Sequence, residues 1–498
     1  MEVQFQKTQL PVLRRLLRSV QQQEQTQEIR LTEDLPDIGS VIGCWGQPVI
    51  RSKEWHSDEM RLSAGVQAHI LYRPEDGSQA RWVECWIPVQ MRWSFPHKQN
   101  DGIMRVLPVV QHVDARNVSA RKLIVRAVLS VCGEGYYQEQ AVACSPAGFP
   151  QDLQMMTQEY LTCIPQEAGE KPFLLEDEVI IPANLPPLKK VVRCEIQPRI
   201  LEKKVLAGKL VFRGNCGVHL LYASDDDALN SWDVEMPFSQ LADLDRDYGP
   251  SSSADIHMVV TGFEQDRNPE DKLLLKCGLS AQYLISDRCV VEVVEDAYSN
   301  LRPVRQQGEL LRLPVRLDVL NDEIPVEQSI NTDPQNVVDV AAYWDCPVLR
   351  QTGNTAEAEI DGQFQILYRN ETDSLQSASM QKQVNCSLDS AAENQVCMVL
   401  SADSPKLGFG PEGTQVSMNL TLETAVFSQQ GIPMITSLEL GEIAEPDPMR
   451  PSLILRKTDG RTLWELAKSC GSTVEAICSA NQLQQEPVPD RMLLIPVL

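Results

Sequence analysis

The 498-residue sequence is short of positive charge and has no long apolar run. Lysine and arginine number 45 against 69 aspartates and glutamates, so the formal net charge is −24. A surface of that sign repels phosphates, and we therefore expect no nucleic-acid partner. No stretch approaches the roughly 18 apolar residues that cross a bilayer, and the first residues lack a signal-peptide core. We predict a protein without membrane insertion that stays in the cytosol.

Catalytic motifs and metal-ligand spacings are also missing. The sequence has no G-x-x-x-x-G-K-[ST] and no G-x-S-x-G, which argues against nucleotide hydrolysis and a serine nucleophile. Its 14 cysteines include no C-x-x-C pair, which indicates buried free thiols, with late oxidative cross-linking as the alternative. None of the six histidines is spaced like a metal pair. We expect no catalytic residues, no metal and no cofactor.

An internal repeat with a period near 150 residues organises most of the chain. Each copy has a tyrosine that ends an Ile-Leu-Tyr or Leu-Leu-Tyr sequence, and a proline that lies 24, 24 or 21 residues before it. These structural anchors are Tyr72, Tyr222 and Tyr368, with Pro48, Pro198 and Pro347. Two anchors that recur three times in this order indicate three copies of one unit.

Two side chains at repeated positions have predictable roles. The anchor tyrosines are expected to place their rings in a core with the hydroxyl at its margin. His69 and His219 occupy equivalent positions beside these tyrosines, and the third copy has Gln365 there. A functional histidine should be present in every copy, so we predict that both histidines are structural.

The dominant hydrophobic period within a copy is two residues. Residues 209–222 and 414–427 alternate apolar with polar or small side chains, and turn-rich segments such as 224–227 separate such runs. This pattern is typical of antiparallel strands with one face in a core. We predict a mainly β protein with three tandem antiparallel sandwich-like or barrel-like repeats, followed by a small βααβ domain.

The repeat register gives provisional boundaries. Residues 10–28 can be read as a helix, whereas the register makes residues 28–35 a strand that leads into the first copy. The expected segments are 1–27 (N-terminal extension), 28–145 (repeat 1), 146–173 (connection), 174–299 (repeat 2), 300–334 (connection), 335–445 (repeat 3) and 446–498 (C-terminal domain).

The last 48 residues predict strand, helix, helix and strand in order. Residues 453–455 form an apolar strand, and a helix begins behind Thr462 with its apolar residues three and four apart. Gly471 stops that helix, Thr473 caps a second one, and residues 492–495 form the closing strand.

This terminal segment resembles a LysM module, and the matching residues occur in order at 462–467, 471–474, 480–483 and 493–496. LysM modules generally bind N-acetylglucosamine-containing glycans in a groove between the loop from the first strand to the first helix and the loop from the second helix to the last strand. The resemblance implies these partner- or glycan-binding residues: Asp459, Gly460, Arg461, Thr462, Trp464, Asn481, Leu483 and Pro489. The family's usual Gly-Asp-Thr is Gly460-Arg461-Thr462 here, so a bulky cation replaces a short acid, and a protein partner is an alternative to sugar.

The repeats resemble the SPOCS domain of spore-coat-associated proteins from spore-forming Firmicutes. Copy two is the clearest, with His219-Leu220-Leu221-Tyr222, Val234 to Phe238, Lys272 to Leu275 and Glu295-Asp296-Ala297-Tyr298. Tandem repeats followed by one LysM module are similar to a clostridial spore-morphogenesis family.

That resemblance implies a non-enzymatic scaffold of the spore coat in the mother cell, at the forespore surface. Its LysM module would dock the coat basement-layer ATPase, a stage IV sporulation protein A type. The rival is a peptidoglycan- or chitooligosaccharide-binding protein of the cortex or cell wall. A hydrolase with an unrecognised pair of carboxylates is a third reading.

Overall fold

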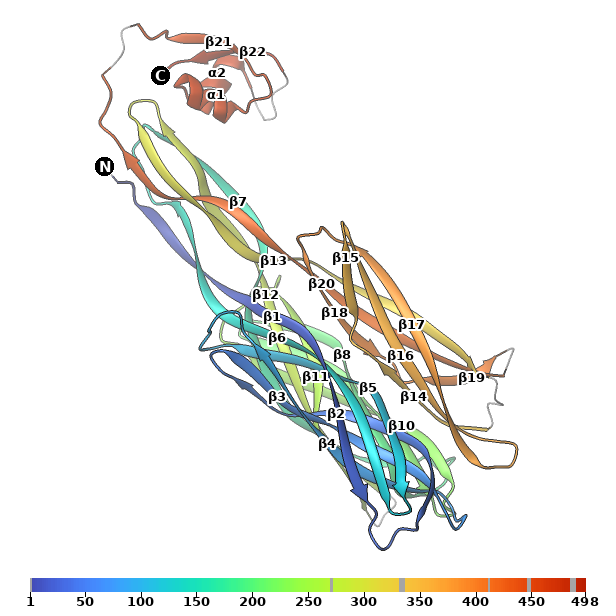
Figure 1. Ribbon diagram of the computed structural model, residues 1–498. Coiled ribbons are helices and arrows are strands. Elements are labelled where there is room, and N and C mark those ends of the chain that lie inside the picture. The colour runs from blue at the N-terminus through green and yellow to red at the C-terminus, as the bar shows by residue number, and fades with distance from the viewer. Residues whose placement is uncertain (1, 269–271, 331–335, 411–412, 446–448, 484–489) are drawn as a thin grey trace.

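The computed structural model describes residues 2–268, 272–330, 336–410, 413–445, 449–483 and 490–498. Its strands are long and antiparallel, and two short helices lie near the C-terminus (Figure 1). The predicted mainly β fold is therefore confirmed. All 14 cysteines are free and nine are buried, as the scattered spacing indicates.

Each repeat consists of two sheets. A long first strand and a long last strand pair with each other, and the last strand also pairs with the strand before it. The intervening strands form an antiparallel meander in a second sheet. Repeat 1 comprises β1 (Phe5–Arg30), β2 (Ile38–Trp55), β3 (Glu59–Pro74), β4 (Arg81–Ser94), β5 (Ile103–Ser119) and β6 (Lys122–Pro146). Its sheets are β1-β6-β5 and β2-β3-β4.

Repeats 2 and 3 follow the same plan. Repeat 2 comprises β7 (Leu153–Ile180), β8 (Leu188–Leu206), β9 (Lys209–Ser224), β10 (Leu229–Asp243), β11 (Ser253–Asn268) and β12 (Lys272–Ser299). In repeat 3 the second and fifth strands are each divided in two. Repeat 3 comprises β13 (Val304–Ile330), β14 (Val337–Trp344), β15 (Val348–Thr352), β16 (Thr355–Arg369), β17 (Leu375–Asp389), β18 (Gln395–Ala402), β19 (Lys406–Gly410) and β20 (Gly413–Leu440).

Alternating apolar side chains explain these strands. Leu123, Val125, Ala127, Leu129 and Val131 of β6 are buried every second residue, and they pack with the β2–β4 sheet to fill the core of repeat 1. The same alternation of buried and less buried positions runs along β12 and β20. The strands predicted at 209–222 and 414–427 from the period of two are confirmed, because these residues lie in β9 and β20.

The N-terminal segment is a strand and not a helix. Residues 5–30 form β1, which pairs along its whole length with β6, and the strand predicted at 28–35 ends at Arg30 before a turn. Side chains in the Gln-rich part of β1 alternate between half-buried and exposed. This pattern fits an outer strand that has one face toward the protein and the other toward solvent. The segments expected as an extension and two connections, 1–27, 146–173 and 300–334, contain most of β1, β7 and β13.

A β-bulge divides each of these long strands at an equivalent residue. The extra residues are Leu16 in β1, Gln166 in β7 and Leu317 in β13, where the pairing with β6, β12 and β20 shifts by one. A bulge bends a strand and increases its twist. On one side of the bulges the strands belong to the sandwiches, and on the other side they continue as three two-stranded ribbons.

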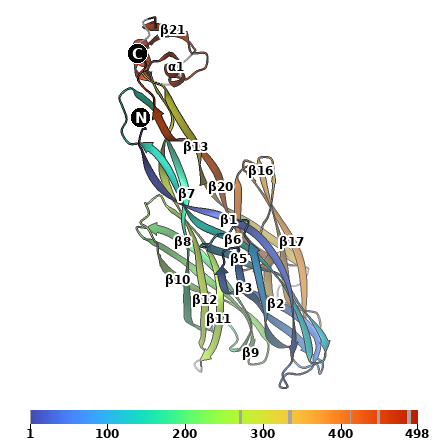
Figure 2. The same cartoon turned by 60° about the vertical axis from the view of Figure 1, so that its left-hand side comes forward.

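These ribbons pack together as a stalk, which we define as residues 5–15 with 136–146, 153–165 with 286–299, and 304–316 with 427–440. Figures 1 and 2 show the stalk projecting beyond the sandwiches toward the N-terminus. Its core takes side chains from all three repeats: Val12, Ala141, Ala143, Cys144, Ile164, Val291, Val293, Leu311, Leu313, Val315, Ile432 and Met434. No repeat could bury these residues alone.

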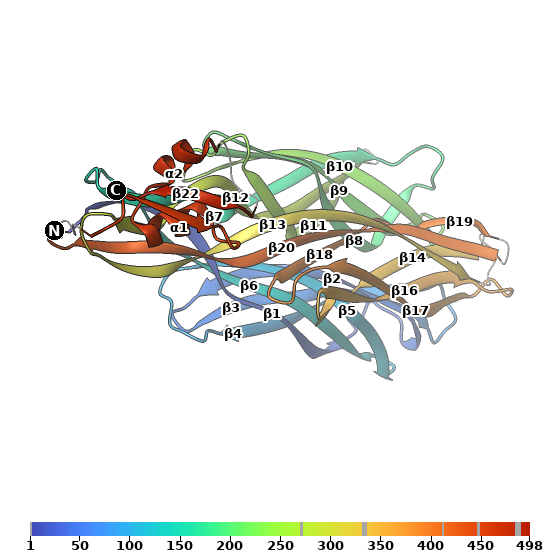
Figure 3. The same cartoon turned by 90° about the horizontal axis from the view of Figure 1, so that it is seen from above.

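The three sandwiches also meet through equivalent residues of their second sheets. Leu71, Leu221 and Leu367 are buried together with the bulge residues Ile42 and Val192, and the third bulge residue, Val338, packs against them. Figure 3 shows the blue, green and orange sandwiches beside one another in the view from above. The repeats are thus arranged about an approximate threefold axis, with a shared contact at each end of the sandwiches.

Two of the anchor tyrosines have equivalent environments. The rings of Tyr72 and Tyr222 are fully buried, and their hydroxyls donate to the carbonyl oxygens of Pro36 (3.1 Å) and Pro186 (2.9 Å). Tyr368 is only half-buried and donates to the side chain of Gln376.

The third proline anchor is out of register. Pro48 and Pro198 pair with residues six positions before Tyr72 and Tyr222, and the residue in that position of repeat 3 is Trp344. Pro347 lies three residues later, in the break between β14 and β15. The shorter spacing of 21 residues reflects this offset, so Pro347 is not the structural equivalent of the other two.

We predict that damage to the stalk spreads to all three repeats. Leu313→Ala removes a fully buried side chain from the shared core and should cost about 2–5 kcal/mol. Hydrogen exchange should accelerate in the stalk parts of β1, β6, β7 and β12 as well as in β13 and β20. The control is Phe364→Ala, which lies in the core of repeat 3 and should affect that repeat. Acceleration confined to β13 and β20 in Leu313→Ala would contradict a shared core.

Candidate functional site

The described part of residues 449–498, the C-terminal unit, has the predicted strand, helix, helix and strand. These elements are β21 (Leu453–Lys457), α1 (Leu463–Cys470), α2 (Val474–Asn481) and β22 (Met492–Pro496), and β21 pairs antiparallel with β22. One small core holds them together, built from Leu463, Leu466, Ala467, Cys470, Ile477, Leu493 and Ile495.

The helix ends follow the sequence signals. Thr462 caps α1 in a capping box with Glu465, because each side chain accepts a hydrogen bond from the other residue's backbone N–H. Gly471 ends the helix in the left-handed conformation with φ 67°. The Thr473 hydroxyl accepts the backbone N–H of Ala476 at the start of α2. The predicted caps are confirmed.

The loop before α1 is the most accessible of the predicted binding segments. Asp459 and Gly460 adopt positive φ angles of 47° and 77°, and both are exposed. The Thr458 hydroxyl donates to Asp490 (2.9 Å), which ties this loop to the start of β22. Arg461 is exposed, and within the described residues its guanidinium has no ion-pair or hydrogen-bond partner. It is therefore a cation available to a ligand.

Two other predicted contact residues are engaged inside the unit. The Asn481 amide donates to the carbonyl oxygens of Ile477 (2.8 Å) and Leu494 (2.6 Å) and accepts the Leu494 N–H (2.8 Å). It thus joins the end of α2 to β22. Leu483 is half-buried against the core of the unit. Pro489 lies outside the described residues.

Trp464 faces the repeats and not the solvent. Its indole N–H donates to the Asp296 carboxylate of β12 (2.8 Å), and its ring packs edge-on against Tyr298 with the ring centroids 4.8 Å apart. Lys468, one turn later, forms an ion pair with Asp296 at 2.7 Å. Burial raises the pKa of Asp296, but the hydrogen bonds from Lys468, Trp464 and Gln306 outweigh it and lower the pKa overall.

The end of β12 also forms hydrogen bonds with the turn between α1 and α2. The Ser472 carbonyl accepts the Tyr298 hydroxyl (2.9 Å) and the Asn300 amide (3.1 Å). Burial and the nearby Asp296 raise the pKa of Tyr298 to about 12, so its hydroxyl stays a donor. Sequence reasoning used Asp296 and Tyr298 as family motif residues and did not predict this contact. Their equivalents in the burial pattern of β20 are Ser437 and Glu439, which explains why the unit docks on repeat 2.

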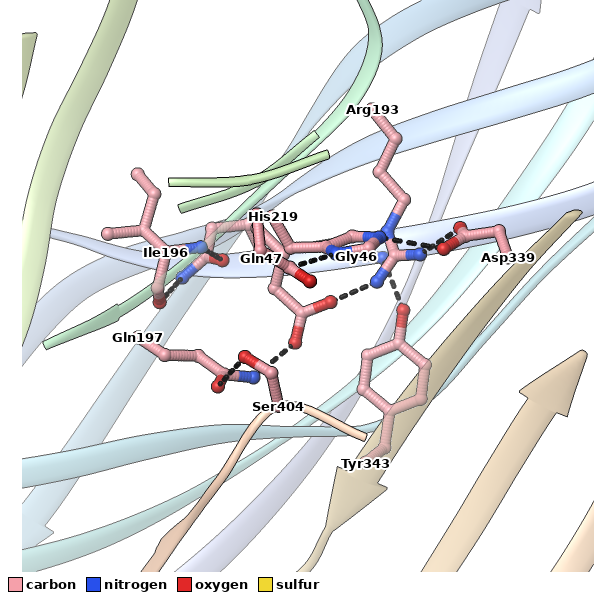
Figure 4. Close-up of polar contacts among 11 residues, drawn as sticks. Gly46, Gln47, Arg193, Ile196, Gln197, His219, Asp339, Tyr343 and Ser404 are labelled. Carbon is pink, nitrogen blue, oxygen red and sulfur yellow. Dashed lines mark hydrogen bonds and ion pairs between the residues drawn. The ribbon is translucent and has the colours of Figure 1, made fainter. Parts of the chain in front are cut away.

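A second polar group of residues lies where the three sandwiches meet. We define the axial cluster as Arg193 and Glu195 of β8, His219 of β9, Asp233 of β10 and Asp339 of β14. Figure 4 shows Arg193, His219 and Asp339 of this cluster close together. Arg193 donates to Asp339 at 2.6 Å and also pairs with Glu195. His219 bridges Asp339 (2.7 Å) and Asp233 (2.6 Å). Arg193 and Asp339 have side chains only 2% and 1% exposed, so the pair is fully desolvated.

The charges of this cluster support one another. Burial acts to raise the pKa of Asp339, but Arg193 and His219 lower it to about 2. Burial acts to lower the pKa of His219, but the charge of Asp339 and the hydrogen bonds that the imidazolium donates to both aspartates raise it to about 10. Burial and the charge of Arg193 lower the pKa of His69 to about 4. His219 is therefore charged at neutral pH, and its equivalent in repeat 1 is not.

Arg193 and Asp339 are themselves equivalent residues. They pair with Leu221 and Leu367, and the corresponding residue opposite Leu71 is Gly43. A Cβ at Gly43 would lie 2.6 Å from the Trp45 ring, so this position needs glycine. The three equivalent positions therefore differ: repeat 1 has no side chain there, repeat 2 has a cation and repeat 3 has an anion. The cluster joins repeats 2 and 3 through His219 and Arg193, which accords with the structural role predicted for His219.

Comparison with protein families supports one part of the resemblance. Residues 187–264 match the family model described as SipL, SPOCS domain. The match begins just before β8 and ends within β11, and so covers the second sheet of repeat 2. This part of repeat 2 is therefore similar to a SPOCS domain. No curated protein and no solved structure matches the chain.

Neither α1 nor α2 is long or apolar enough to cross a bilayer. No three His, Cys, Asp or Glu side chains in the described ranges are grouped as ligands for a metal ion.

We predict a pH-dependent role for His219 in stability. The folded pKa of about 10 lies above the unfolded value of about 6.5, so the stabilisation is complete below about pH 6.5 and is lost as the pH rises through 10. His219→Gln should cost roughly 3 kcal/mol at pH 7.5 and much less at pH 10.5, measured by thermal unfolding. His69→Gln is the control, because His69 is neutral across this range. A cost for His219→Gln that does not change with pH would refute the charged form.

We also predict that Asp296 anchors the C-terminal unit. Asp296→Ala removes the acceptor of Trp464 and Lys468 and should weaken docking by roughly 2–4 kcal/mol. Small-angle scattering should then report a larger radius of gyration. The matched control is Ser437→Ala, at the equivalent position of β20. An unchanged radius in Asp296→Ala would show that the remaining contacts, including the Tyr298 and Asn300 hydrogen bonds to Ser472, are enough to hold the unit.

Proposed function

We propose that this protein is a non-enzymatic scaffold of spore-coat assembly. The SPOCS match of residues 187–264 supports a sporulation role, and it is the observation that carries the proposal. Repeats 1 and 3 share the strand order and the bulge positions of repeat 2, which favours diverged copies of the same domain. Packed as three sandwiches on one stalk, they form a rigid body that is suited to presenting surfaces.

The proposed partner is the coat basement-layer ATPase of the stage IV sporulation protein A type, in the mother cell at the forespore surface. The C-terminal unit, read as a LysM module, would be the docking element. Its strand, helix, helix and strand order fits that reading. Arg461 would be a direct contact, because it is exposed and its cation has no partner within the described residues. Trp464 supports the contact indirectly, since it fixes α1 on β12.

The test measures binding of the full chain to the purified ATPase. Arg461→Asp should weaken binding about tenfold, as expected for loss of one arginine at an interface. Arg92→Asp changes the charge by the same amount on exposed β4 of repeat 1 and should leave binding unchanged. If wild type and Arg461→Asp bound the ATPase with equal affinity, Arg461 would not be part of the interface.

The same three proteins would be tested on peptidoglycan and chitooligosaccharide. Binding to sugar without binding to the ATPase would replace the scaffold proposal by the glycan-binding alternative. Release of soluble sugars from peptidoglycan would instead revive a hydrolase.

A further inference from the structure

Three connected hollows form a groove that runs from the β8–β9 hairpin of repeat 2 to β13 of repeat 3. Their volumes are about 650, 570 and 550 Å³. The first two share Lys203, Lys204 and Leu206 of β8, and the last two share Ser253 and Arg316. They therefore follow one another along the surface, and we call them together the basic groove.

The groove is positively charged on a strongly acidic chain. Five cationic side chains but only two carboxylates line it, whereas the whole chain has a net charge of −24. Lys204, Arg213 and Arg288 are exposed, and no ion pair involves them among the residues that the structure describes. Lys203 pairs with Glu423 and Arg316 with Asp255. Three cations thus remain for an anionic ligand.

Apolar side chains lie between these cations. Leu201 is 64% exposed, Leu317 is 55% exposed and Leu161 is 74% exposed. Leu201 and Leu317 are the extra residues of β-bulges in β8 and β13. A bulge interrupts the regular alternation of side chains between the two faces of a sheet at these positions. Exposed apolar patches mark surfaces that bind other proteins, and arginine is enriched among the residues that anchor such interfaces.

Strand edges form two walls of the groove. β8 is the outer strand of the sheet β10-β9-β8, and β13 is the outer strand of β13-β20-β18. An outer strand offers backbone N–H and C=O groups to an added extended segment. The groove therefore combines edge backbone, leucine side chains and unpaired cations.

We propose that the basic groove binds an extended acidic segment of a partner protein, in which Asp or Glu alternates with aliphatic side chains. In such a segment successive side chains point to opposite sides, so that carboxylates can reach the cations while aliphatic groups cover the leucines. A nucleic acid fits less well, because the chain's overall charge repels it and exposed leucines offer it little. The site is independent of the C-terminal unit and does not rest on the proposed ATPase contact.

The test uses the full chain and a fluorescent peptide of about ten residues that alternates Glu with Leu or Val. Fluorescence anisotropy should show saturable binding that weakens between about 50 and about 300 mM salt. The double variant Lys204→Glu with Arg288→Glu should weaken binding at least about tenfold. Leu201→Asp, which leaves the cations in place, should also weaken it.

Matched controls separate the groove from general charge effects. Arg92→Glu with Lys98→Glu makes the same change of charge on exposed residues of repeat 1 and should leave binding within about twofold. A peptide with Lys in place of Glu should not bind. Equal loss in both double variants, no binding of the acidic peptide, or tighter binding of single-stranded oligothymidylate than of the peptide would each overturn the proposal.

Discussion

The structure depends on burial that the three repeats can achieve only together. Each repeat has a pair of strands too long for its own sandwich, and the excess length carries apolar residues such as Val12, Ile164 and Leu313. Exposed, these ribbons would be isolated hairpins, which are marginal in water. Packed against one another, they form the stalk and give a chain of tandem domains the cohesion of one body. The hydrophobic effect therefore holds the three repeats together as well as stabilising each sandwich.

Near the other end of the approximate threefold axis, the three repeats have different residues at equivalent positions, and this difference fixes how they pack together. A threefold arrangement of identical residues would place like charges or three bulky side chains at one point. The chain instead has Gly43, Arg193 and Asp339 at the equivalent positions. A buried ion pair contributes little net stability, but removing one partner is costly. The pair thus favours one order of the repeats around the axis over the others.

Local features of the fold were predictable from the sequence, and contacts between distant segments were not. The period of two, the repeats and the caps at Thr462 and Gly471 all depend on neighbouring residues. The 10–28 segment was ambiguous because a Gln-rich stretch fits either a helix surface or a sheet edge, and only pairing with β6 decides between them. Trp464 could be recognised as important, but its partner Asp296 lies 168 residues away with no local signal. Pro347 lies near the position of the other two anchor prolines in the sequence but is not equivalent to them, and only the strand register reveals this.

The path of the chain through the stalk has a consequence for synthesis on the ribosome. The first strand, β1, begins beside the end of β20, where the Val3 N–H donates to the Leu438 carbonyl at 2.9 Å. A nascent chain can complete the sandwich of repeat 1 early, but half of β1 and half of β6 must wait for residues beyond 430 to cover them. Until then the emerging polypeptide carries an uncovered apolar ribbon, of the kind that chaperones bind. Synthesis of β20, and not completion of each sandwich, is therefore the step that finishes the stalk core.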